Sequence, residues 1–180
     1  MSASTRDVKT SRTSITQRSL IALFAVAAAC GGSPVGSAGQ GGTFDATVTG
    51  AANAQLTGYA GSQGQAGTVW VLQLTATDVE NHIEISKEGV GRPDPGMYPL
   101  VDYTTSETGS APPNYFVASV SLNPSLGAGP GFDRLTGTMT VTQSTAGSVA
   151  GTFTMTASLS TNPASTITVT GTFASVNQGT

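Results

Sequence analysis

The sequence predicts an all-β protein, either a single antiparallel β-sandwich or a squat β-barrel of eight or nine strands. Apolar and hydroxyl side chains alternate along several segments, as they do on the two faces of a strand. Turn residues such as Gly, Pro, Asn and Ser separate these segments at short intervals. Charged residues make up only 9% of the 180 residues, against roughly 25% in typical soluble domains. Solubility is therefore expected to rest on Ser and Thr hydroxyls.

The clearest alternation lies in residues 135–173, which are predicted to form three antiparallel strands joined by short turns. Odd-numbered positions there are mostly apolar, and the even-numbered positions between them are almost all Thr or Ser. Each strand should therefore have one apolar face and one hydroxyl face. The apolar face is expected to include Met139, Val141, Phe153, Met155, Ile167 and Val169.

Five shorter strands are expected before this segment, at residues 44–50, 55–60, 68–76, 81–86 and 115–122. The first two should form a hairpin. The third is the most apolar and contains the only tryptophan, Trp70. Such a run is typical of a strand buried on both sides, so Trp70 is expected in the core; the alternative is a surface platform for a ligand.

Loops are expected at residues 61–67, 89–99, 106–114 and 123–131, and no helix is expected after residue 30. Residues 89–99 contain three prolines, which lack the N–H group that a sheet ladder needs. This segment is therefore predicted to be a loop that brings Tyr98 and Leu100 towards the core.

The N-terminus has the layout of a secretory signal. Residues 1–19 are polar and basic, and residues 20–29 are an uninterrupted apolar run of 10 residues. A helix that spans a bilayer needs about 20 apolar residues, so this run is too short to remain as an anchor. Residues 1–29 are predicted to be a cleaved signal peptide, and residues 43–180 to be the antiparallel β domain.

The segment that follows, Ala-Ala-Ala-Cys-Gly at residues 27–31, resembles the lipobox of bacterial lipoproteins, although Ala27 stands where leucine is usual. The resemblance implies that Cys30 is acylated, and Gly31 in place of aspartate implies the outer membrane. Cys30 is the only cysteine and cannot form an intrachain disulfide. Residues 31–42 are a Gly/Ser-rich spacer. The alternative is ordinary cleavage, which would leave a secreted or periplasmic protein with a free thiol.

The order of segments is similar to that of small bacterial lipoproteins of an uncharacterised all-β family. The shared features are the lipid-attachment cysteine, the glycine-rich spacer, the opening GTFDATVTG at residues 42–50 and a Gly-x-Tyr-x-Leu at residues 96–100. The closing GTMTV, VAGTFTMTA and ITVTGTF segments complete the pattern. The resemblance implies fold and location, and it carries no catalytic residue.

Candidate chemistry in the sequence is sparse. His82 is the only histidine, and Asp78, Glu80 and Glu84 have the same parity along the chain. On one strand these four side chains would share a face, where carboxylates suit Ca²⁺. The spacing matches no Ca²⁺ loop, and a single histidine cannot build the usual zinc site. Neither a metal nor another cofactor is expected, and no nucleophile-elbow pattern points to a hydrolase.

Two tyrosines and two carboxylates in predicted loops form the candidate ligand site together with His82. Tyr98 and Tyr103 lie near Asp94 and Asp102 in the sequence, and loops of this kind could bind a glycan or a peptide. The regular threonines of residues 136–172 could meet ice or a crystalline polysaccharide. A solvent face is the expected role, because Thr favours strands and the twist of a sheet spoils a flat lattice match.

The sequence favours a non-enzymatic binding or structural module held at the cell envelope by a lipid on Cys30. Removal of residues 1–29 leaves nine acidic and three basic residues, a net charge of −6. An acidic domain with scattered cations is unsuited to nucleic acid. Two alternatives stay open. One is a calycin-like binder with a small ligand inside the barrel, and the other is an enzyme that uses His82 with nearby carboxylates.

Overall fold

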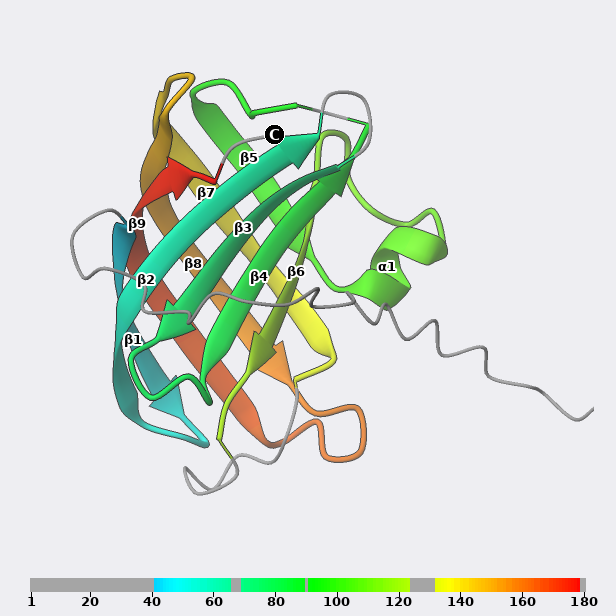
Figure 1. Cartoon of the computed structure of the whole chain (residues 1–180). Coiled ribbons are helices and arrows are strands. Elements are labelled where there is room, and N and C mark those ends of the chain that lie inside the picture. The colour runs from blue at the N-terminus through cyan, green and yellow to red at the C-terminus, as the bar shows by residue number, and fades with distance from the viewer. Residues whose placement is uncertain (1–40, 66–68, 90, 124–131, 179–180) are drawn as a thin grey trace, which may run out of the picture. The chain divides into compact units, whose positions relative to one another are not determined.

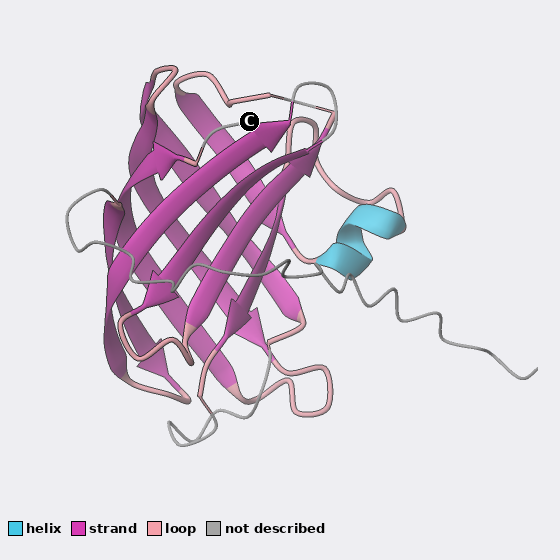
Figure 2. Ribbon diagram, viewed as in Figure 1, coloured by secondary structure: helices cyan, strands magenta, loops and turns pink. Residues whose placement is uncertain are grey.

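Nine strands close into a barrel in the part of the chain that the computed structural model describes, residues 41–65, 69–89, 91–123 and 132–178 (Figures 1 and 2). The all-β prediction is confirmed, and the architecture is the barrel rather than the sandwich. The predicted signal peptide, Cys30 and most of the spacer lie outside the described residues. Within those residues, no helix has the length and apolarity needed to cross a membrane.

The barrel begins with β1 and ends with β9, which pair with each other. The elements in chain order are β1 (Gly42–Gly50), β2 (Ala54–Gln65), β3 (Val69–Ala76), β4 (His82–Glu88), β5 (Gly96–Val101), α1 (Tyr103–Glu107), β6 (Phe116–Ser121), β7 (Arg134–Ser144), β8 (Ser148–Ser158) and β9 (Thr166–Asn177). Around the barrel their order is β1-β2-β3-β4-β6-β5-β7-β8-β9. The pairing is antiparallel except between β5 and β6 and in a short contact between β2 and β9.

The predicted meander of β7, β8 and β9 is confirmed with its faces as expected. The six apolar side chains named above for residues 139–169 are each at most 2% exposed. The threonines that alternate with them point outwards, as the burial pattern of β8 shows. The apolar face of every strand in the meander therefore fills the inside of the barrel.

Trp70 lies in the core and is fully buried, which confirms the expected packing role. Its ring meets Phe116 edge-on, with ring centroids 5.7 Å apart. Tyr98 packs on the same phenylalanine at 5.0 Å, and the Lys87 ammonium lies 5.2 Å from its ring centre. Edge-to-face pairs of this kind add to the free energy gained by burying the rings. The cluster joins β3, β5 and β6 across the inside of the barrel.

Two phenylalanines and two glycines interlock between β8 and β9. Gly151 pairs with Phe173, and Phe153 pairs with Gly171. A Cβ atom on Gly171 would lie 2.6 Å from the Phe153 ring, and one on Gly151 would lie 3.1 Å from the Phe173 ring. Each ring therefore covers the glycine across from it, an arrangement that compensates for glycine in strands.

Three details of the expected fold are wrong. Residues 61–65 continue β2 and pair with β3, rather than forming a turn. The close approach of the Trp70 ring to Gly64 explains the glycine there, since a Cβ atom would lie 3.2 Å from the ring. The sequence prediction depended on an alternation of large apolar and polar side chains. Residues 61–65 lack this alternation, so the strand was not predicted there.

The second difference is β5, which includes Pro99 in the segment expected to be a loop. β5 pairs with β7 over its six residues but with β6 only at Leu100 and Val101. At Pro99 the strand therefore has one paired neighbour, the setting in which a sheet tolerates proline. Leu100 is buried and Tyr98 is half-buried against Phe116, so both do reach the core.

The third difference is the short helix α1, where no helix was expected. β5 and β6 are adjacent and parallel, and parallel neighbours need a crossover of a dozen or more residues. Residues 102–115 supply this crossover on the outside of the barrel, with α1 in its first half (Figure 1). The helix has no buried residue, so it leaves no amphipathic pattern in the sequence.

Gly171→Ala is expected to destabilise the barrel by about 1–3 kcal/mol, the usual effect of overpacking. The new Cβ atom would lie 2.6 Å from the Phe153 ring and 2.7 Å from the Asp45 carbonyl oxygen, and backbone cannot easily yield. The control is Gly147→Ala in the β7–β8 turn, where nothing lies within 4 Å of the added atom. Urea unfolding followed by Trp70 fluorescence measures both. If the two variants were equally stable, the contact between Gly171 and Phe153 would not be tightly packed.

Candidate functional site

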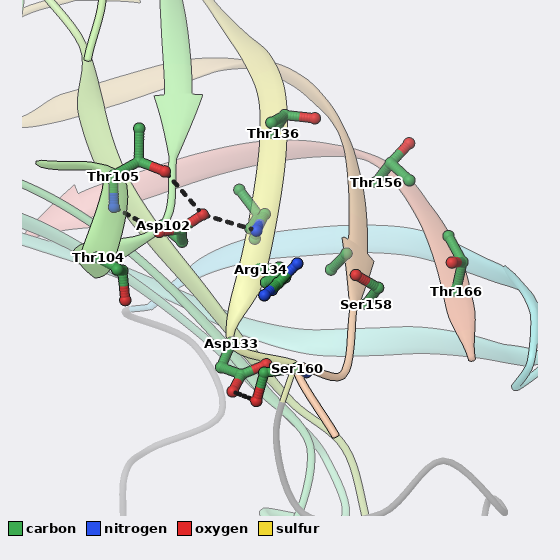
Figure 3. A pocket seen from close by; sticks show the side chains of 12 residues that line it. Asp102, Thr104, Thr105, Asp133, Arg134, Thr136, Thr156, Ser158, Ser160 and Thr166 are labelled. Carbon is green, nitrogen blue, oxygen red and sulfur yellow. Dashed lines mark hydrogen bonds between the residues drawn. The ribbon is translucent and has the colours of Figure 1, made fainter. Parts of the chain in front are cut away.

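An open hollow of about 660 Å³ lies on the outer wall of the barrel. The beginnings of β7 and β9, the end of β8 and the start of α1 surround it, as Figure 3 shows. It contains two carboxylates, one guanidinium and a group of hydroxyls. Its lining residues are Asp102, Thr104, Thr105, Asp133, Arg134, Leu135, Thr136, Thr156, Ala157, Ser158, Ser160 and Thr166.

Asp102 joins the crossover to β7. Its carboxylate caps α1 by accepting a hydrogen bond from the Thr105 N–H at 2.7 Å, and it also accepts from the Thr105 hydroxyl at 3.0 Å. A third bond comes from the Leu135 N–H at 3.2 Å. Burial alone would raise the pKa of Asp102, but these hydrogen bonds outweigh burial and lower the pKa. The side chain is thus an ionised structural acceptor at neutral pH.

Asp133 is held in the same way from the other side of the hollow. It accepts hydrogen bonds from the Ser160 hydroxyl and from the Ser160 N–H, the latter at 2.6 Å. These two bonds lower the pKa of Asp133, and the charge of Arg134 contributes in the same direction. The bonds tie the start of β7 to the loop between β8 and β9.

Arg134 is the only cation of the hollow, and its guanidinium makes no hydrogen bond or ion pair within the described residues. It stands at the first position of β7 and is exposed. The hydroxyls of Thr104, Thr136, Thr156 and Ser158 likewise have no hydrogen-bond partner in this part of the chain. Five N–H donors and four hydroxyls are therefore available to a bound molecule.

Threonines continue from the hollow across β7, β8 and β9 in register, and we call them the threonine rows. They are outward-facing and, apart from half-buried Thr140, exposed. Neighbours within a row are one strand spacing apart, about 4.8 Å, and successive rows are about 6.7 Å apart. The rows are Thr136–Thr156–Thr168, Thr138–Thr154–Thr170 and Thr140–Thr152–Thr172.

A bulge in β7 ends the rows at their far side. The register against β8 shifts between Val141 and Gln143, so that Gln143 and not Thr142 lies opposite Ala150. Thr142 donates its hydroxyl hydrogen bond to the Ala150 carbonyl at 3.2 Å. The expected hydroxyl face is thus present for three rows, and the regular register does not continue to Thr142.

The five residues expected to form a ligand site do not converge on one concavity, although Tyr98 contacts Asp94. Asp102 lines the hollow. Tyr98 donates a hydrogen bond to the Asp94 carbonyl at 2.7 Å, and burial and the Asp94 charge raise the pKa of Tyr98. Tyr103 lies exposed on α1, where a hydrogen bond to Glu107 raises its pKa.

His82 lies far from the tyrosines. It is paired with Ser121, five residues along β6 from Phe116, on which Tyr98 packs, a separation of about 17 Å along the strand. The shared acidic face with Asp78 and Glu80 is also not formed, because residues 77–80 are a turn with Val79 at φ 56°. Within the described ranges no three His, Cys, Asp or Glu side chains come together as metal ligands.

Sequence reasoning missed Asp133 and Arg134, the two charged residues at the start of β7. Their only signal is position, directly after a Gly/Pro loop and directly before an alternating strand. The parallel crossover, which the sequence did not reveal, brings α1 to the beginning of β7 and so completes the hollow. No family model matches this chain, and no significant match was found among curated proteins or solved structures.

Asp102→Asn is expected to lower the free energy of unfolding by about 1–3 kcal/mol at pH 7, because an amide nitrogen replaces one accepting oxygen. Asp102 has a lowered pKa in the folded state. Its stabilising effect is therefore complete above the unfolded pKa of about 3.9 and is lost as pH falls through the folded pKa. The difference between variant and wild type should shrink below pH 4.

Chemical unfolding at several pH values measures this difference. The matched control is Asp94→Asn, an exposed carboxylate that should change stability little. A variant as stable as wild type at pH 7 would contradict the capping and cross-linking role of Asp102.

Proposed function

We propose that the protein is a lipid-anchored module of the cell envelope whose barrel binds a ligand without chemical conversion. The observation that supports the anchor is the order of three segments. The apolar run of residues 20–29 ends at Cys30, and the Gly/Ser spacer that follows ends where β1 begins at Gly42. Several acyl chains on one cysteine give durable membrane attachment, which a single chain does not.

The spacer sets the distance between lipid and barrel. By composition alone, a Gly/Ser-rich segment of 12 residues would span roughly 20 Å as a random coil. This length holds a folded domain clear of the headgroups while keeping it at the surface. The outer membrane is the proposed location, and release as a secreted or periplasmic protein is the outcome that ordinary signal cleavage would give.

The chemistry of the hollow supports binding rather than catalysis. A general acid or base has a pKa near the working pH, whereas hydrogen bonds lower the pKa of both Asp102 and Asp133. Asp102 also accepts a hydrogen bond from Leu135, and Asp133 accepts one from Ser160. A reaction at either carboxylate would have to break these bonds. Arg134 and the hydroxyls that have no partner among the described residues are suited to holding a ligand.

The packing of the barrel supports a binding site on its outside rather than a calycin-like site in its interior. Its interior contains packed side chains, among them Trp70, Leu72, Met139 and Phe153, all at most 1% exposed. A calycin-like ligand would have to replace such side chains. The described hollow needs no rearrangement to admit a molecule from solvent.

Palmitate labelling of cells that produce the full chain tests the anchor. The wild-type protein should incorporate radiolabelled palmitate and fractionate with membranes, and Cys30→Ala should do neither, because the only thiol in the chain is lost. Ser33→Ala is the matched control in the same spacer and should label as wild type does. An unlabelled wild type, with a free thiol on Cys30 by mass spectrometry, would refute the anchor.

A further inference from the structure

The hollow and the threonine rows form one continuous surface. Thr136 and Thr156 belong to both, since they line the hollow and make up most of the first row. A molecule that enters the hollow therefore meets further hydroxyls along β7, β8 and β9. The strand preference of threonine explains the rows alone. It does not explain why they lead to Arg134, whose guanidinium has no hydrogen-bond or ion-pair partner in the described part of the chain.

The side chains of the rows are free to bind. None of the nine threonine hydroxyls makes a hydrogen bond within the described residues, and none of the nine positions is charged. On β1 the rows meet Thr49, Thr47 and Asp45. There Thr47 and Asp45 are bonded through Gln55, at 2.9 and 2.6 Å. On β1, therefore, only Thr49 extends the first row with a hydroxyl that makes no hydrogen bond among the described residues, while Thr47 and Asp45 at the ends of the other two rows are occupied.

The charges around the hollow select against ionic ligands. The hollow is lined by Arg134 and two ionised carboxylates, Asp102 and Asp133, so its lining has a net charge of −1, and the chain after residue 29 has −6. An anionic polymer would be repelled at long range. A cation would meet Arg134, while both carboxylates already accept hydrogen bonds from Thr105, Leu135 and Ser160. The complementary ligand is an uncharged molecule with many hydroxyls.

We propose that this surface binds a neutral polysaccharide, with one sugar in the hollow at Arg134 and the chain continuing along the threonine rows. Sugar hydroxyls both donate and accept, as do the threonine hydroxyls that face them. The barrel wall twists, so a single flexible chain can follow it where a flat crystal face cannot. The inference deepens the proposed binding function and does not depend on the lipid anchor.

The experiment uses the full chain solubilised in detergent and measures affinity by calorimetry. The probes are neutral di- and hexasaccharides of glucose, mannose and galactose. Polygalacturonate serves as the anionic polysaccharide for comparison. A neutral hexasaccharide should bind more tightly than its disaccharide, because only the longer chain reaches the rows beyond the hollow. No binding in the neutral panel, or tighter binding of polygalacturonate, would overturn the proposal.

Two variants separate the hollow from the rows. Arg134→Ala should weaken both lengths about tenfold or more, the usual effect of losing hydrogen bonds from a charged donor. The triple variant Thr138→Val, Thr154→Val and Thr170→Val keeps side-chain shape and removes the second row of hydroxyls. It should weaken the hexasaccharide about tenfold and leave the disaccharide unchanged.

The matched control is Thr43→Val, an exposed threonine on β1 paired with Ala174. That position is eight residues along β9 from Thr166, about 26 Å from the hollow. It should bind as wild type does. Loss in Thr43→Val equal to that in the triple variant would overturn the proposal, and so would unchanged binding by a folded Arg134→Ala. Failure of palmitate labelling would refute the lipid anchor but would not change the sugar affinities measured here. The anchor and the polysaccharide site can therefore fail independently.

Discussion

Closure of the barrel through β9 is the constraint on which the other features depend. This strand pairs with β8 over residues 166–176 on one side, and on the other side with β1 over residues 167–174 and with β2 at its end. The last strand of the sheet therefore has no open edge. Because side chains alternate with a period of two, a slip of one residue in either ladder would turn Ile167 and Val169 to water. The dry interior and the hydroxyl exterior therefore have the same cause.

Features that depend on neighbouring residues in the chain were predicted from the sequence, and features that depend on distant segments were not. The meander of β7, β8 and β9 was predicted because its alternation is long and its turns are short, and the burial of Trp70 followed from the apolar run around it. β5 and α1 were not predicted. β5 is a strand because of its ladder with β7, and α1 lies in the crossover to the parallel neighbour β6. Both pairings join segments that local patterns cannot relate.

The candidate site was less predictable than the fold for the same reason. Asp102 was selected as a loop carboxylate, and it does line the hollow, but its role there is to hold α1 and β7 together. Arg134 has no local signal that distinguishes it from any other cation at the start of a strand. His82, Tyr98 and Tyr103 stood out because such residues are rare in this chain, and rarity says nothing about proximity.

The direction in which the chain enters the barrel determines which end is accessible. β1 begins at Gly42 next to the end of β9, where Thr43 pairs with Ala174, while the hollow lies at the opposite rim, where β9 begins at Thr166. The first described residues of the chain and the hollow are therefore at opposite ends of β9. If Cys30 is acylated as we propose, the length of this strand would separate the hollow from the point where the tether joins the barrel.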